Sequence, residues 1–91
     1  MTDRAERIRS ALCSTFDDAR VELVDESHKH VGHVGARDGR GHFALRIVSA
    51  AFVGQGRLAR HRSVYAALGH LMQTDIHALS IEALAPEEES S

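Results

Sequence analysis

The chain has 91 residues, of which 43% are hydrophobic and 26% are charged, with a formal net charge of −2 at pH 7. This length supports one hydrophobic core, and the composition is typical of a globular domain. The sequence shows no apolar run of membrane-spanning length and no secretory signal, and its one cysteine, Cys13, excludes an intrachain disulfide. We therefore expect a cytoplasmic protein that has no membrane partner.

The first half of the chain predicts one helix and two strands. Apolar residues at spacings of three and four, from Ala5 to Phe16, predict an amphipathic helix. Alternating apolar and polar residues predict a short strand over 21–24 and a longer strand over 42–49. Glycines and three histidines between the strands make 27–41 a loop. The residues expected on the inward face of the longer strand are Phe43, Leu45 and Ile47.

The second half predicts a helix and a third strand. A turn with two glycines precedes a helix from about Arg57 to Met72. Its expected inward stripe is Leu58, His61, Val64, Tyr65, Leu68 and Leu71. Residues 76–84 predict a strand. The residues expected on one of its faces are His77, Leu79, Ile81 and Ala83.

The predicted order of helix, strand, strand, helix, strand defines an α+β protein. Three strands cannot enclose a core alone, so we expect a small three-stranded mixed sheet covered by helices. This domain should occupy residues 1–85, and residues 86–91 should form an acidic, disordered tail because they contain three consecutive glutamates. The hydrolase nucleophile motif, the nucleotide-binding loop and the dinucleotide fingerprint are all missing from the sequence. We therefore expect a protein that is not an enzyme.

Histidine is the most unusual feature of the composition, with seven residues in the chain. His28, His30 and His33 lie in the glycine-rich loop, where several imidazoles can converge on zinc, copper or iron. The alternatives are a solvated polar loop, or a loop that binds nickel or zinc adventitiously. His77 differs because it begins a strand, and its alternative role is that of a histidine hydrogen-bonded at a strand edge.

Arginine is concentrated in the middle of the chain. Between Arg37 and Arg62 there are six arginines and one acidic residue, a local excess of +5. Arg57, Arg60 and Arg62 follow a glycine turn and begin a helix, an arrangement that favours phosphate and hence nucleic acid. The alternative is a solvated helix face.

Five strings of residues, in order, resemble the BolA family from about residue 8 to residue 86. They are Val24-Asp25-Glu26-Ser27; His42-Phe43 leading into Ile47-Val48-Ser49; Phe52-x-Gly54; Leu58-x-Arg60-His61-Arg62-x-Val64-Tyr65; and Ile76-His77-Ala78-Leu79. The resemblance implies a fold similar to the second class of KH domains. It also implies a heterodimer in which this chain and a monothiol glutaredoxin share a [2Fe–2S] cluster. The isolated protein is expected to hold no cluster.

In such a complex the glutaredoxin cysteine and a glutathione thiol supply two cluster ligands, and the BolA-like chain supplies the others. The resemblance assigns the family's invariant histidine to His77 and its loop ligand to His30, with His28 and His33 as alternates. Family members are also described as transcriptional regulators of stress and cell shape that contact DNA through the second helix. With the turn that precedes this helix, that region corresponds here to Phe52 through Tyr65, which contains Arg57, Arg60 and Arg62. The sequence therefore predicts an adaptor in iron–sulfur trafficking or redox and iron signalling, or alternatively a DNA-binding regulator.

Overall fold

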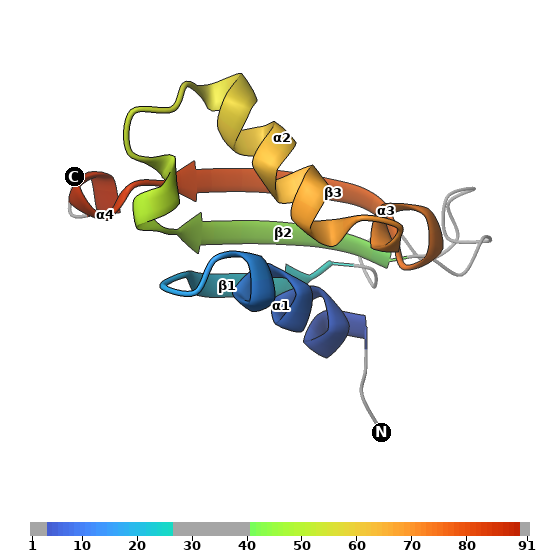
Figure 1. Cartoon of the computed structure of the whole chain (residues 1–91). Helices are drawn as coiled ribbons and strands as arrows, with labels where there is room; N and C mark the ends of the chain where they lie inside the picture. The colour runs from blue at the N-terminus through green and yellow to red at the C-terminus, as the bar shows by residue number, and fades with distance from the viewer. Residues whose placement is uncertain (1–3, 27–40, 90–91) are drawn as a thin grey trace.

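The computed structural model describes residues 4–26 and 41–89 (Figure 1). The elements in chain order are α1 (Arg4–Thr15), β1 (Arg20–Asp25), β2 (Gly41–Val48), the 3-10 helix η3 (Ala50–Phe52), α2 (Arg57–Leu68), α3 (Leu71–Thr74), β3 (Ile76–Leu84) and α4 (Pro86–Glu89). This order confirms the predicted α+β class. Within the described part of the chain, no helix has the length and apolar character needed to cross a lipid bilayer.

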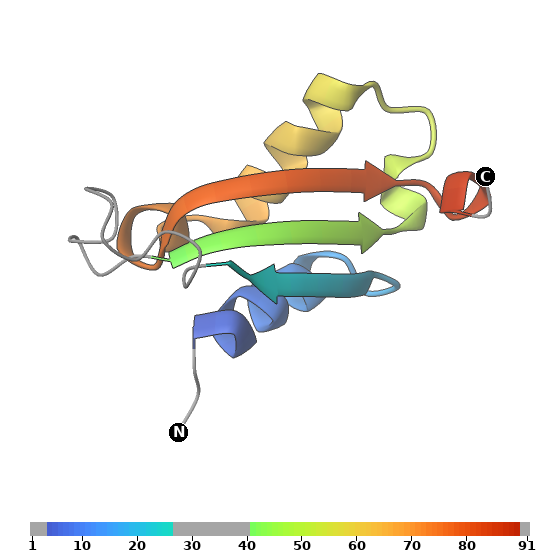
Figure 2. The ribbon, with the colours of Figure 1, turned by 180° about the vertical axis from the view of Figure 1, so that it is seen from behind.

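The three strands form one mixed sheet with β2 in the centre. β2 pairs with β1 in the antiparallel sense and with β3 in the parallel sense, as the mixed-sheet prediction requires. Because β2 and β3 are parallel, both begin at one end of the sheet and both finish at the other (Figures 1 and 2). The two ends of this strand pair carry the two candidate sites described below.

The core lies between the sheet and the helices α1 and α2. Seen from behind, the sheet stands in front of both helices, so they cover the same face (Figure 2). The predicted stripe of α1 is confirmed, because Ile8 and Leu12 are fully buried and Phe16 packs against Phe52 with ring centroids 5.3 Å apart. The predicted inward face of β2 is also confirmed. Its buried residues are Phe43, Leu45 and Ile47.

The second helix is shorter than the sequence predicts. α2 begins at Arg57 as expected but ends at Leu68, and α3 follows as a separate turn. The cause is Gly69, which has a φ of +55°, a conformation that glycine adopts readily and other residues rarely do. The Gly69 N–H donates to the carbonyl oxygen of Tyr65 at 3.0 Å, which closes the helix.

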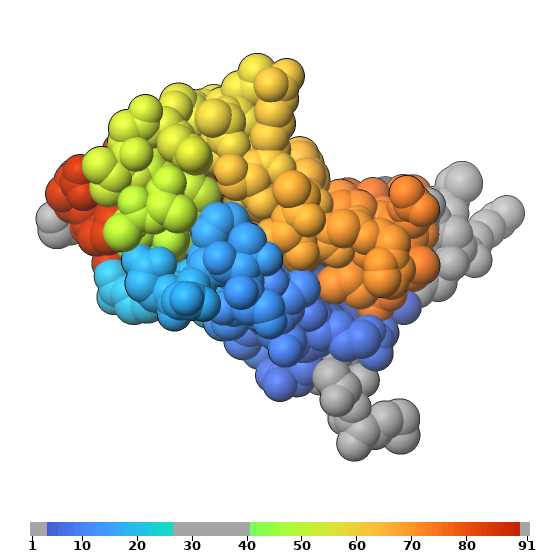
Figure 3. Space-filling view, viewed as in Figure 1, coloured from blue at the N-terminus to red at the C-terminus, as the bar shows by residue number. Residues whose placement is uncertain are grey.

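The predicted inward stripe of α2 is wrong at two positions. Val64 and Leu68 are buried, whereas Leu58 is 65% exposed and Tyr65 is 42% exposed. Tyr65 directly follows Val64 and therefore projects about 100° further round the helix. Leu58 lies in the first turn of α2, and Figure 3 shows this end of the helix standing out from the rest of the surface. A three-stranded sheet is too narrow to cover the whole length of both helices.

The acidic segment after β3 also differs from the expectation of a disordered tail, since Pro86–Glu89 forms α4. Proline at the first position of a helix has the required φ, and glutamates in the first turn interact favourably with the helix dipole. Ala85, just before α4, is 1% exposed and fixes its start against the core.

Candidate functional site

His77 lies at a β-bulge where β2 and β3 begin. Gly41 pairs with Ile76 and His42 pairs with Ala78, so β3 contains one extra residue, His77, between these two pairs. Ile76 is fully buried and His77 is exposed. The expectation that His77 shares a face with Leu79, Ile81 and Ala83 is therefore wrong, because a bulge reverses the alternation of side chains. The bulge directs the His77 ring away from the core.

A second histidine lies beside His77. The ring centroids of His42 and His77 are 5.0 Å apart, with the ring planes inclined by 48°. His42 is the second residue of β2 and is half-buried, whereas His77 is exposed at the start of β3. We call this pair of residues the histidine edge. The parallel pairing of β2 and β3 brings the two rings to one end of the sheet.

The histidine edge lies where the predicted ligand loop leaves and rejoins the sheet. Glu26 precedes that loop and Gly41 is its last predicted residue, and the Glu26 N–H donates to the His42 carbonyl oxygen at 2.7 Å. His28, His30 and His33 themselves lie outside the described residues. In the ranges 4–26 and 41–89, no three histidine, cysteine, aspartate or glutamate side chains are grouped as metal ligands would be. The described residues thus offer two imidazoles at this edge.

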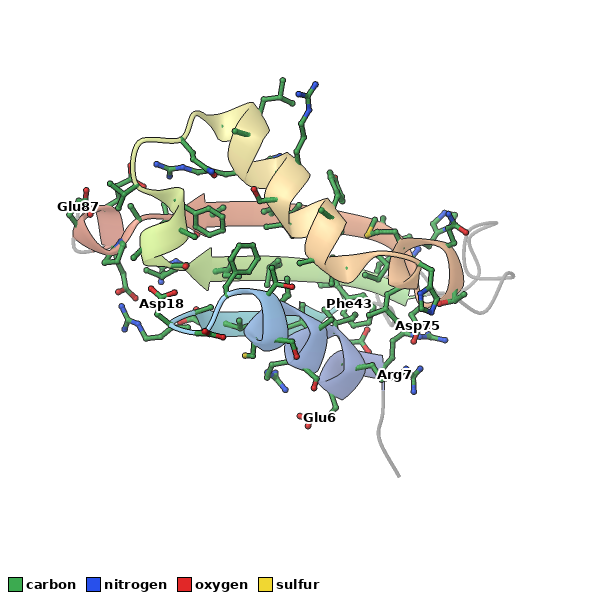
Figure 4. All side chains as sticks on the ribbon, in the orientation of Figure 1. Glu6, Arg7, Asp18, Phe43, Asp75 and Glu87 are labelled. Atoms are coloured by element: carbon green, nitrogen blue, oxygen red, sulfur yellow. The ribbon has the colours of Figure 1, made fainter. Side chains whose placement is uncertain are left out.

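Asp75 supports the histidine edge from the residue before β3. Its side chain is largely buried and accepts hydrogen bonds from Thr74 Oγ1 at 2.7 Å and Arg7 Nε at 2.9 Å. Figure 4 shows Arg7 and Asp75 side by side. The Thr74 hydrogen bond, followed by the Arg7 hydrogen bond and charge, lowers the pKa of Asp75, with burial opposing them. The Asp75 carbonyl oxygen also accepts from the Gly41 N–H at 2.9 Å, so the starts of β2 and β3 are joined.

The three predicted phosphate-binding arginines are not equivalent. Arg57 and Arg62 are exposed on α2, whereas the Arg60 side chain is only 13% exposed. Arg60 Nε donates to the Gln55 carbonyl oxygen at 2.9 Å, and Nη1 donates to the Ala83 carbonyl oxygen at 3.0 Å. Arg60 therefore joins the turn before α2 to the end of β3.

Arg60 also forms a two-point ion pair with α4. Its Nη1 and Nη2 atoms donate to the two carboxylate oxygens of Glu88 at 2.6 and 3.1 Å. We call the Arg60–Glu88 pair the clasp. The Arg60 hydrogen bond, and then the one from the Ala85 N–H, lower the pKa of Glu88 from 4.5 to about 2. A second ion pair joins α4 to β1 through Glu89 and Arg20.

Two features of these sites are not evident from the sequence. The role of Glu88 is hidden by its place in an acidic run, although Pro86 followed by glutamates is a recognised helix start. In the sequence, His42 stands out only as the start of the predicted strand and as part of a family string. Its proximity to His77 depends on parallel strands that begin together, and the alternation of apolar residues within one strand does not reveal which strand lies beside it. His61, expected inside, is half-buried beside Arg57 and Arg60.

The fold and the histidine edge define a small α+β protein with paired imidazoles at the start of two parallel strands. The family model described as BolA-like protein matches residues 12–88. The chain therefore belongs to the BolA-like family, which confirms the resemblance seen in the sequence.

Curated relatives agree with this assignment. An uncharacterized protein in the cobS 5′ region of Sinorhizobium sp is 42% identical over 85 residues, which cover 91% of each chain. The DNA-binding transcriptional regulator BolA of Escherichia coli is 35% identical over 83 residues, covering 91% of this chain and 76% of the relative. SufE-like protein 1 of Arabidopsis thaliana is 42% identical over 90 residues, covering 93% of this chain but only 24% of that protein. This chain likewise spans 58% of Arabidopsis Protein BOLA1.

Solved structures show the same fold. BolA1 from Arabidopsis thaliana matches with a TM-score of 0.81 and 32% identity, over 98% of this chain and 99% of that chain. The BolA domain of SufE1 from the same plant also has a TM-score of 0.81, with 40% identity over 97% of this chain and 98% of that chain.

Proposed function

We propose that this chain is a non-enzymatic cytoplasmic adaptor that binds a monothiol glutaredoxin and shares a [2Fe–2S] cluster with it. The role would lie in iron–sulfur trafficking or in redox and iron signalling. The observation that carries the proposal is the histidine edge, where the exposed ring of His77 lies beside that of His42. Membership of the BolA-like family supports it.

The chemistry of the donor set fits this cluster. Imidazole is a good ligand for iron, and two histidines replace two cysteines on one iron of Rieske-type centres. A [2Fe–2S] cluster takes four ligands, of which this chain would supply two, His77 and one histidine of the loop. Cysteine thiolates from a partner would complete the set. When bound, such a cluster supplies one-electron redox chemistry at a potential raised by its histidine ligands.

The residues of this chain have distinct tasks in the proposed complex. His77 presents its imidazole at the bulge, and buried Ile76 beside it holds the backbone in place. His30, or its alternates His28 and His33, would supply the second ligand. His42 restricts the position of the His77 ring from the neighbouring strand.

The test is reconstitution with a monothiol glutaredoxin, iron, sulfide and glutathione, followed by visible absorption and circular dichroism. The wild-type chain should form a 1:1 complex whose spectrum differs from that of the glutaredoxin-bound cluster alone. His77→Ala should abolish the difference, His30→Ala should weaken or perturb it, and the triple variant at His28, His30 and His33 should match His77→Ala. A folded His77→Ala complex with the wild-type spectrum would contradict the assignment.

His70→Ala is the matched control for this experiment. His70 is exposed like His77 but lies between α2 and α3, where it precedes the first residue of α3. Its loss removes one imidazole without changing the histidine edge. The cluster spectrum of this variant should equal that of the wild-type complex, and an equal loss in both variants would point to adventitious iron binding by histidines.

A second candidate function is DNA binding, either alone or in addition. It is favoured by the exposed arginines Arg57 and Arg62 on α2 and by the name of the Escherichia coli relative, a DNA-binding transcriptional regulator. Each phosphate contact contributes a slope of about −0.9 to the dependence of log affinity on log salt concentration. Arg57→Ala and Arg62→Ala should therefore each reduce the magnitude of the slope by about 0.9 if they contact phosphate. An unchanged slope in both folded variants would remove this candidate.

A further inference from the structure

The clasp places a carboxylate where a phosphate would bind. The two terminal nitrogens of Arg60 each donate to one oxygen of Glu88, at 2.6 and 3.1 Å. Arginine recognises carboxylate and phosphate through the same planar, two-point geometry. Glu88 therefore occupies the atoms of Arg60 that would otherwise be offered to an oxyanion.

The surroundings of the clasp are suited to an anion. Glu88 borders a cavity of about 400 Å³ whose lining includes Arg57, Arg60 and His61, and also Glu82, whose carboxylate pairs with Arg46. The neighbouring Glu89 pairs with Arg20 on β1, so α4 engages two arginines that belong to different elements. Both arginines are thus paired with carboxylates of α4.

The ion pairs that hold α4 are weak enough to be replaced by contacts with a ligand. α4 has four residues, and none of them is buried. The Glu88 side chain is 43% exposed, and exposed ion pairs add little to stability and weaken as salt is raised. Ala85, in contrast, is buried, which fixes the point at which α4 would swing away. Opening the clasp would leave the core between the sheet and the helices intact.

We propose that α4 is an internal competitor for DNA, in which Glu88 covers Arg60 and must be displaced before Arg60 can contact a backbone phosphate. The proposal rests on the second candidate function. It assigns Arg57 and Arg62 to phosphate contacts that are always available and Arg60 to one that α4 controls. The surface that binds DNA then has two states, which differ by one phosphate contact.

The test compares Glu88→Gln with Glu87→Gln on a nonspecific DNA duplex across a range of salt concentrations. Both variants remove one negative charge from α4, but only Glu88 contacts Arg60, whereas Glu87 lies on the outer side of α4 (Figure 4). Glu88→Gln should bind more tightly at low salt, with a slope steeper by about 0.9. Glu87→Gln should keep the wild-type slope.

Arg60→Ala, made in the wild-type and the Glu88→Gln backgrounds, completes a double-mutant cycle. In the wild-type background it should leave the salt slope unchanged, because Arg60 is covered, and in the Glu88→Gln background it should remove the added 0.9. Equal gains in the two glutamine variants, or no gain in Glu88→Gln while the wild-type chain binds DNA, would overturn the competitor role alone. If no protein in the series binds DNA, both the second candidate function and the competitor role are wrong.

Discussion

The two ends of α2 are held by different forces. The last turn buries Leu68, which is 2% exposed, in the same core as Ile76 at the start of β3. The first turn leaves Leu58 65% exposed and is held by Arg60, through carbonyl oxygens and Glu88. Apolar packing responds little to salt, whereas an exposed ion pair weakens with salt and with protonation. The last turn of α2 is therefore fixed in the core, and we call it the fixed end. The first turn is held by hydrogen bonds and an ion pair that a ligand could replace, and we call it the exchangeable end.

This difference corresponds to the two proposed activities. A metal ligand needs a reproducible position, and His77 follows directly after the fully buried Ile76. A phosphate-binding arginine needs to be accessible, and Arg60 becomes accessible only when the contacts to α4 open. The fixed end suits coordination, and the exchangeable end suits regulation.

The largest expected effect is the contrast between Leu68→Ala and Leu58→Ala. The first substitution leaves a cavity in the core and should lower the free energy of unfolding by about 2–5 kcal/mol. The second removes an exposed side chain and should change it by less than about 0.5 kcal/mol. Urea denaturation followed by circular dichroism measures both. Similar losses in the two variants would show that the first turn of α2 is packed in solution, which would break the comparison.

The same pair of leucines shows why the sequence predicts helices better than their contacts. The spacing of apolar residues correctly starts α2 at Arg57, and the alternation in 42–49 correctly identifies the buried face of β2. The spacing cannot reveal that the sheet is too narrow to cover Leu58, because the width of the sheet depends on strand pairing. The bulge at His77 is equally nonlocal, since it exists only relative to the register with β2.

The candidate sites also depend on contacts between residues that are far apart in the sequence. Strand position and family resemblance both direct attention to His77, which the structure places on an exposed edge. Its neighbour His42 is 35 positions away in the sequence, and only the parallel pairing brings the rings together. Arg60 and Glu88 are 28 positions apart, so an acidic run that looks solvated in the sequence becomes the partner of a predicted DNA contact.

A smaller effect is expected from Asp75→Asn, a substitution between α3 and β3 on the side of the fixed end of α2. The substitution removes the charge that pairs with Arg7 and one of the hydrogen bonds of the buried carboxylate. We expect a loss of about 1–2 kcal/mol in the free energy of unfolding at pH 7, toward the low side for a charged hydrogen bond because Arg7 is partly exposed. The exposed Asp17→Asn is the control and should leave the stability essentially unchanged.

The pH dependence of this effect has a defined sign. The folded protein lowers the pKa of Asp75 below its ordinary value of 3.8, so its contribution is fully present above that value. It is lost as the pH falls through the lowered pKa. The difference in stability between the wild-type chain and Asp75→Asn should therefore shrink in acid, and a difference that stays constant below pH 3.8 would contradict the role of the Arg7–Asp75 pair.

The smallest expected effect is at the exchangeable end of α2, and the quantity measured is the pKa of Glu88. Its pKa should be about 2 in the wild-type chain, so the clasp is fully formed above the ordinary value of 4.5 and opens as the pH falls toward 2. Carboxyl carbon shifts in NMR spectra measure this midpoint directly. Arg60→Ala should move the midpoint back toward 4.5 without reaching it, because the Ala85 N–H still donates to Glu88 at 2.8 Å. A wild-type midpoint near 4.5 would mean that α4 is already open in solution, and Arg60 would then be available to phosphate at neutral pH.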